Sequence, residues 1–262
     1  MFSYRPAFHT GSHADILKHL TLIHLVQYLQ EKSGALTIVD TDAGAGIYSL
    51  QDKFSTVSKE ADGGIFRLKQ YIKTCLQIPP ESIQAYLKQI DTEKVEGRLD
   101  NYPGSPFMLA RLLRHNVNQL KQSKQIDVYA EDSFASLKGL LPSPSRRGLI
   151  LIDPSYEDKQ DYRYLETAMQ EALTRFATGC YAIWYPAISR RESAALPDFL
   201  KKIAANHKRS WLNTELRVEN APGERRLQSS GMFIINPPWT LEKHLAQVLP
   251  TLTKVIGING GG

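Results

Sequence analysis

Leu149-Ile150-Leu151-Ile152-Asp153-Pro154-Ser155-Tyr156 is an apolar run that ends abruptly in an acid, a proline, a small residue and an aromatic. Consecutive branched apolar residues predict a buried strand, and the residues after them predict a turn. In an open α/β sheet, ligands bind outside the carboxyl ends of the strands. The sequence therefore predicts that residues 153–156 lie where a ligand is bound.

The functional groups of this turn suit a planar base. Asp153 supplies a hydrogen-bond acceptor, and Pro154 supplies a main-chain carbonyl in a residue that has no N–H. The two acceptors would hold an exocyclic amino group and aim its lone pair, through positioning and charge complementarity. Tyr156 would stack on the base, a contact worth about 1–3 kcal/mol. The turn thus predicts methylation of an amino group, and an ordinary turn that ends a strand is the alternative.

A similar run, Ile234-Ile235-Asn236-Pro237-Pro238-Trp239, competes for this role because an amide oxygen also accepts hydrogen bonds. Its strand is expected to pair with residues 213–218 at the edge of the sheet, further from the strand that would hold a cofactor. We therefore expect Asp153 rather than Asn236 to be the acceptor.

Strands that alternate with helices predict an α/β fold with a largely parallel sheet. The last two strands are expected to form an antiparallel hairpin. The core would comprise residues 1–46 and 102–262, and residues 47–101 would form a helical insert with helices at 64–75 and 81–90. Outside the insert, strands are expected at 36–40, 126–129, 149–152, 180–185, 213–218 and 232–235, and helices at 14–31, 107–114, 134–140, 164–176 and 191–205.

Composition sets broad bounds on the chain. Its 262 residues are 42% hydrophobic and 23% charged, as in ordinary globular proteins. The net charge of +5 permits a polyanionic partner. Cys75 and Cys180 form no CxxC motif, so neither a zinc site nor a disulfide framework is indicated. With no signal peptide and no long apolar run, we expect a cytoplasmic protein without a membrane span.

A second ligand-binding turn is predicted at Val39-Asp40-Thr41-Asp42-Ala43-Gly44-Ala45-Gly46, which follows a short apolar strand. Glycines let a ligand approach the backbone closely. Neither GxGxxG nor GK[ST] is present, so a phosphate-binding loop is not indicated. Acids at a strand end together with GxG suit a cationic amino-acid ligand such as S-adenosylmethionine, for which Asp40, Asp42 and Gly44 are candidates. A tight turn without function is the alternative.

The N-terminal segment carries a cluster of polar side chains. Tyr4, Arg5 and His9 are candidates for substrate binding, and Lys18 and His19 could line the mouth of a cofactor site. His9 and a second histidine four residues later could bind a metal on a helix, but no third ligand is evident, so no metal is predicted. A solvated helix start is the alternative for each residue.

Several motifs along the chain are specific in combination: Ser3-Tyr4-Arg5, residues 13–19, 40–46, 102–106, 146–149 and 153–156, Trp184-Tyr185-Pro186, and residues 236–239. In these motifs the chain resembles the bacterial family that methylates adenine N6 in 23S ribosomal RNA, once described as involved in catabolism of external DNA. The resemblance extends over nearly the whole chain.

The resemblance implies a monomeric, S-adenosylmethionine-dependent enzyme with a Rossmann-like core and a helical insert. Asp153 would be the catalytic acceptor, beside Pro154 and Tyr156, and Tyr4 would contact 23S ribosomal RNA. Two rival functions stay open: a DNA adenine-N6 methyltransferase, and a non-catalytic nucleic-acid-binding module. The resemblance also implies a set of side chains around the cofactor, which are Lys18, His19, Asp42, Ser105, Asp132 and Ser133.

The chain departs from the family pattern at three places. Asp42 replaces a histidine, and Ser155 replaces the usual second proline. The family also has a strand that ends in a ribose-binding glutamate between the helix at 107–114 and the strand at 126–129, and no such run is present here. We therefore hypothesise that residues are missing between about Arg114 and His115. A normal peptide link between those two residues, with Cα atoms about 3.8 Å apart, would contradict this.

Overall fold

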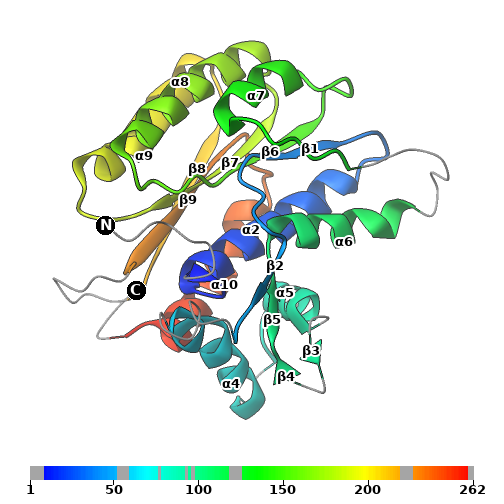
Figure 1. The fold of residues 1–262 in the computed structure, drawn as a ribbon, viewed down its shortest axis with the longest axis vertical. Coiled ribbons are helices and arrows are strands. Elements are labelled where there is room, and N and C mark those ends of the chain that lie inside the picture. The colour runs from blue at the N-terminus through cyan, green and yellow to red at the C-terminus, as the bar shows by residue number, and fades with distance from the viewer. Residues whose placement is uncertain are drawn as a thin grey trace.

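A computed structural model describes residues 9–51, 59–75, 78–91, 94–95, 98–117, 126–218 and 227–258 (Figure 1). Its centre is a five-stranded sheet in the order β1-β6-β7-β9-β8. The bounds of the strands, in sheet order, are Thr37–Asp40, Gly148–Ile152, Cys180–Pro186, Ser229–Ile235 and Trp211–Arg217.

Strand direction determines which residues meet at each edge of this sheet. β1, β6 and β7 are parallel, with Asp40 opposite Leu151 and Leu151 opposite Ala182. β9 is antiparallel to both of its neighbours, β7 and β8. The carboxyl ends of β1 and β6 therefore lie at the same end of the sheet, as expected for a ligand site in an α/β sheet.

Helices cover both faces of the sheet, which explains why every residue of β6, β7 and β9 is buried (Figure 1). α2 (His13–Gln30) and α10 (Leu241–Ile256) lie on one face. α2 has apolar residues on all sides, as in other buried helices. The other face carries the remaining layer of helices, which consists of α7 (Ser133–Leu140), α8 (Lys159–Arg175) and α9 (Arg191–Asn206).

The prediction of a mixed α/β fold with a mostly parallel sheet is confirmed, and five of the six expected strands are present. The strand expected at 126–129 is wrong. Residues 126–130 have no regular structure, and the side chains of Ile126 and Val128 are 54% and 88% exposed. β1 is consequently an edge strand. α10 has no counterpart among the helices expected from the sequence.

The predicted insert, residues 47–101, begins and ends at one small antiparallel ladder between β2 (Ile47–Ser49) and β5 (Asn101–Pro103). It contacts α2 and α10. Its boundaries stay a prediction, and its content is helical with a short hairpin. The elements inside it are a one-turn π-helix (Asp62–Phe66), α4 (Arg67–Thr74), α5 (Glu81–Asp91), β3 (Lys94–Val95) and β4 (Arg98–Leu99).

α6 (Ser105–Val117) runs without a break across Arg114 and His115. A continuous helix joins these two residues but does not show whether the chain is shorter here than its family, so the hypothesis that residues are missing near Arg114 stays a prediction. Within the described parts of the chain, no helix is both long and apolar enough to span a bilayer.

Candidate active site

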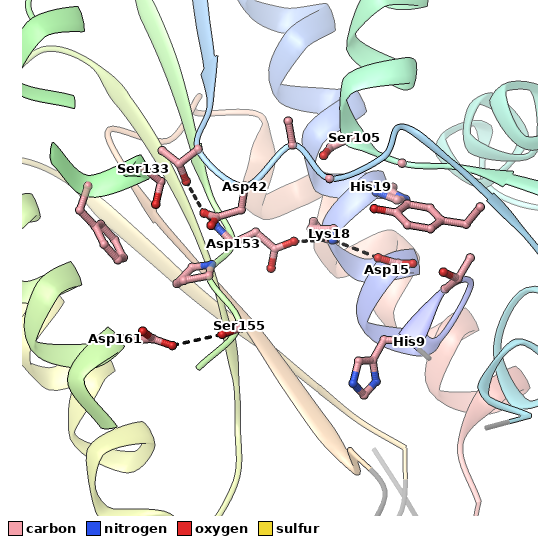
Figure 2. A pocket seen from close by; sticks show the side chains of 18 of the residues that line it. His9, Asp15, Lys18, His19, Asp42, Ser105, Ser133, Asp153, Ser155 and Asp161 are labelled. Atoms are coloured by element: carbon pink, nitrogen blue, oxygen red, sulfur yellow. Dashed lines mark hydrogen bonds and ion pairs between the residues drawn. The ribbon is translucent and has the colours of Figure 1, made fainter. Parts of the chain in front are cut away.

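A pocket of about 600 Å³ opens where β1 and β6 end (Figure 2). Of the residues predicted from the sequence, Asp40 and Tyr156 do not line it, and Tyr4 and Arg5 lie outside the described residues. The predicted residues that do line it are His9, Lys18, His19, Asp42, Gly44, Ser105, Asp132, Ser133, Asp153 and Pro154.

Asp153 is held by an ion pair with a residue far away in the sequence. Lys18 Nζ, in the second turn of α2, lies 2.5 Å from Asp153 Oδ2 and 3.0 Å from Asp15 Oδ1 (Figure 2). Burial raises the pKa of Asp153 to about 7, although Lys18 acts to lower it. Burial also acts to raise the pKa of Asp15, but Lys18 outweighs it and the pKa of Asp15 is lowered. Asp153 is therefore poised to change charge near neutral pH.

Tyr156 does not supply the flat face expected of it. Its side chain is 3% exposed, and its hydroxyl donates to the Trp184 carbonyl at 2.7 Å. The ring packs against Tyr162, with ring centroids 4.7 Å apart. The backbone of Tyr156 has a positive φ of 53°, and Arg190 Nη1 donates to its carbonyl at 2.8 Å. In this conformation Tyr156 is part of the core, so the predicted stacking on a base is wrong.

Ser155, which replaces a proline of the family pattern, fixes the same turn through its hydroxyl. Ser155 Oγ donates to Asp161 Oδ2 at 3.2 Å, which ties the turn to the first turn of α8 (Figure 2). Both residues line the pocket. A proline at position 155 could not form this bond.

The turn after β1 presents backbone and acids to the pocket. Gly44 has a positive φ of 59°, which favours glycine, and an added Cβ would lie 2.1 Å from the Tyr48 hydroxyl. Asp42 Oδ2 accepts from Thr41 Oγ1 at 2.5 Å and from the Asp153 N–H at 3.4 Å. Burial raises the pKa of Asp42. Asp42 therefore joins the two ligand-binding turns.

Asp40 lies at the end of β1, behind the pocket lining. Both of its carboxylate oxygens are buried, and among the described residues neither has a partner with hydrogen-bond geometry. Burial raises its pKa, while the nearby Ser105 hydroxyl acts to lower it. Burying a carboxylate without a hydrogen-bond partner costs free energy of folding. Such unpaired buried groups are typical of functional sites.

Three aromatic residues that sequence reasoning missed line the pocket: Tyr48, Phe134 and Tyr164. Phe134 and Tyr164 have ring centroids 6.4 Å apart, and Tyr164 is 53% exposed. Phe134 follows the predicted pair Asp132 and Ser133 directly and could have been included with them. Asp132 itself caps α7, accepting from the Ala135 N–H at 2.7 Å. No sequence pattern identified Tyr164, because it lies on the exposed side of a helix.

The competing motif at Asn236 lies at the other end of the sheet from the pocket, near the start of β7. β9 runs antiparallel to β7, so Ile235 pairs with Tyr181 near the start of β7. Asn236 Nδ2 donates to the carbonyls of Ala177 and Gly179 at 2.8 and 2.7 Å. The expectation that Asn236 is remote from the pocket holds. The expected pairing is also confirmed, because β9 pairs with the edge strand β8 and β7 separates it from β6.

Two other residues of the quoted sequence segments can be placed. His9 Nδ1 lies 3.0 Å from Glu60 Oε2. Burial acts to lower the pKa of His9, but Glu60 outweighs it and the pKa is raised. Arg147, in the motif at residues 146–149, donates to the carbonyls of Leu29 and Gly34. Arg147 therefore anchors the end of α2.

Comparison with known proteins gives consistent matches. A family model described as "Ribosomal RNA large subunit methyltransferase D, RlmJ" matches residues 33–120 and 116–262. A relative from Haemophilus influenzae, named "Ribosomal RNA large subunit methyltransferase J", is 38% identical over 279 residues, covering 100% of this chain and 96% of the relative. One of the same name from Escherichia coli K12 is 36% identical over 268 residues, covering 96% and 93%.

A solved structure is also similar. A crystal structure of a protein from Legionella pneumophila strain Philadelphia 1 has a TM-score of 0.81 and 31% identity, covering 97% of this chain and 96% of that chain. The alignment with the Haemophilus influenzae relative has 17 more positions than this chain has residues, 279 against 262. The two segments matched by the family model overlap at residues 116–120.

Proposed function

The chain belongs to the RlmJ family of ribosomal RNA large subunit methyltransferases, and from this premise we propose that its pocket transfers a methyl group from S-adenosylmethionine to the N6 amino group of an adenine in 23S ribosomal RNA. The observation that carries the proposal is Asp153. It ends a buried strand, lines the pocket beside Pro154, and has one carboxylate oxygen bound by Lys18.

The pocket has the chemistry to hold S-adenosylmethionine, whose sulfonium supplies the electrophilic methyl group. The methionyl part of this cofactor also carries an ammonium group, so an acidic site suits it. Five aspartates and one lysine are among the described lining residues. Asp40 adds a buried carboxylate that has no partner with hydrogen-bond geometry among the described residues. The residues that would surround the cofactor are Lys18, His19, Asp42, Gly44, Ser105, Asp132 and Ser133, with Asp40 behind them.

Asp153 and Pro154 would accept the two hydrogens of the adenine amino group. Lys18 bonds Oδ2 of Asp153, and the second oxygen, Oδ1, is then the acceptor for the base. These bonds orient the N6 lone pair, which otherwise is delocalised into the ring. Methyl transfer would form an N–C bond and break the S–C bond of the cofactor, so N6 would have to lose one proton. Asp153, with a pKa of about 7, can take it.

Phe134 and Tyr164 take over the stacking role expected of Tyr156. They are the aromatic pair at the pocket wall, and Tyr164 is half exposed. A base stacked on an aromatic ring gains about 1–3 kcal/mol. An adenine inside a helix would first have to be flipped out to reach them.

We propose the finer features of the architecture on the same premise. The sheet would be a Rossmann-like methyltransferase sheet whose β1 has become an edge strand, with residues 47–101 as its insert. The enzyme would act as a monomer in the cytoplasm, where ribosomal RNA is made and where Cys75 and Cys180 stay free. Tyr4, Arg5 and His9 would contact the RNA.

One experiment tests the proposal against both rivals. Methyl transfer from labelled S-adenosylmethionine is measured with 23S ribosomal RNA and with DNA as acceptors, with Asp153→Ala as the control. Label in RNA that Asp153→Ala abolishes supports the proposal, and label in DNA alone favours the DNA enzyme. Calorimetry that detects no binding of S-adenosylmethionine favours the non-catalytic module.

A further inference from the structure

A chain of three buried polar groups leads from the insert to the pocket. Tyr86, on α5, and Tyr102, on β5, are both fully buried, and their hydroxyl oxygens are 2.8 Å apart. Tyr102 Oη also lies 3.0 Å from His19 Nδ1, and the two rings are stacked with centroids 5.6 Å apart. His19 is 1% exposed, yet it is one of the residues that line the pocket.

The protons of this chain can be assigned by counting. Burial lowers the pKa of His19 to about 3, so its ring is neutral and carries one N–H. Burial raises the pKa of both tyrosines, so each keeps its hydroxyl proton. Among the described residues, Tyr86 is bonded only to Tyr102, and Tyr102 only to Tyr86 and His19.

Only one direction of donation gives both hydroxyl protons an acceptor among the described residues. If Tyr86 donates to Tyr102, then Tyr102 donates to His19 Nδ1, and the ring proton of His19 is on Nε2. In the reverse direction, His19 Nδ1–H would donate to Tyr102 and Tyr102 to Tyr86. The hydroxyl proton of Tyr86 would then have no acceptor among the described residues in a fully buried place, which is unfavourable.

We propose that Tyr102 is a positioning residue that fixes His19 as the Nε2–H tautomer, so that His19 presents a neutral hydrogen-bond donor to the ligand. His19 Nε2 has no partner within the described protein. A donor selects an acceptor, and the charged groups that face His19 are Asp15 and Lys18. On the proposed function, the matching acceptor is the carboxylate of the methionyl part of S-adenosylmethionine.

The tautomer is measured first, in the ligand-free protein, by long-range ¹H–¹⁵N NMR of the histidine rings. Wild type is expected to show His19 with its proton on Nε2. Tyr102→Phe, which removes the donor that the described residues supply to Nδ1, is expected to release this preference and give a mixture of tautomers. Tyr86→Phe is the matched control. It also deletes a buried hydroxyl, but it leaves His19 as the only acceptor for Tyr102, so the Nε2–H tautomer is kept.

Ligand affinity is measured next, by calorimetry with S-adenosylmethionine and with its decarboxylated analogue. Tyr102→Phe should weaken binding of S-adenosylmethionine by about tenfold, as for one hydrogen bond to a charged group, and leave the analogue unchanged. Tyr86→Phe should change neither affinity.

Three results would overturn the inference. These are an Nδ1–H tautomer in wild type, an unchanged tautomer in Tyr102→Phe, and equal losses of both ligands in that variant, which would mark a merely structural role. If wild type bound neither ligand, the proposed function would fail, while the NMR result would still decide the tautomer.

Discussion

Lys18 Nζ lies 2.5 Å from Asp153 Oδ2 and joins the second turn of α2 to the end of β6. The side chains of the two residues are only 14% and 11% exposed, so water screens the pair weakly. Burial and Lys18 act on Asp153 in opposite directions, and the pKa of its carboxyl group settles at about 7. This balance makes the proposed reaction sensitive to pH in the neutral range.

Methyl transfer should rise with pH through about 7 and level off above it. The pKa of Asp153 is raised, so its carboxyl group is mostly protonated below that pH and cannot accept from the adenine amino group. The measurement is kcat/KM against pH, which reports the pKa of the free enzyme. Asp153→Asn should flatten this limb, and Asp153→Ala should lower the rate by about 10²–10³-fold, as for loss of a preorganised group. A pH limb that persists in Asp153→Asn would assign it to another residue.

Lys18→Met should move the same limb to higher pH. Without the ammonium, burial acts on Asp153 unopposed and its pKa rises further above 7. The free energy of unfolding depends on pH for the same reason. Because the pKa of Asp153 is raised in the folded state, ionisation of its carboxyl group destabilises that state. Stability is therefore lost as pH rises from about 4 to the folded pKa. The pH profile of kcat/KM checks the first effect, and denaturant unfolding across this pH range checks the second. Lys18→Arg is the charge-conserving control in both measurements. If the midpoint of the pH limb were the same in Lys18→Met as in wild type, Lys18 would not set the pKa of Asp153.

Ser155→Ala should lower the free energy of unfolding by about 0.5–1.5 kcal/mol, the usual value for one hydrogen bond. The reason is the loss of the bond from Ser155 Oγ to Asp161. In a chain of this size each kcal/mol shifts Tm by about 2–4 °C. A double-mutant cycle with Asp161→Ala isolates the pair, and a coupling energy near zero would show that the bond contributes nothing.

Tyr156→Phe should destabilise the protein by about 1–3 kcal/mol, because it leaves the buried Trp184 carbonyl without its donor. The KM for RNA should stay within about threefold of wild type, since such a change corresponds to under 1 kcal/mol. Tyr164→Ala should do the reverse, raising KM with little loss of stability, because Tyr164 is half exposed at the pocket wall. If Tyr164→Ala left KM unchanged, the stacking role would have to lie elsewhere.

Asn236→Ala should reduce stability and leave methyl transfer intact. The substitution removes two hydrogen bonds to the carbonyls of Ala177 and Gly179 and places alanine at a φ of 55°. Asn236→Gly separates the two causes, since glycine tolerates this φ. Loss of activity in a folded Asn236→Ala protein, together with retained activity in Asp153→Ala, would move the site to the other edge of the sheet.

Local patterns were enough to find most elements and half of the residues that line the pocket. The apolar runs of β6 and β7 identify buried strands, and the acids that follow β1 and β6 mark the pocket edge. Periodicity failed at residues 126–129, where an apolar-polar alternation predicts a strand. A strand also needs a neighbour to bond with, and β1 has none on that side in the described chain.

The sequence by itself determined the chemistry of each turn, because side-chain type and strand termination are local properties. Only the tertiary structure decided which groups meet. Lys18 reaches Asp153 across 135 positions of sequence, and Tyr102 bonds to His19 across 83. Because β9 is antiparallel to β7, Asn236 lies at the end of the sheet away from the pocket, and the side chain of Tyr156 packs in the core. Strand direction and side-chain burial depend on which elements become neighbours, and that is set by the packing of the whole chain.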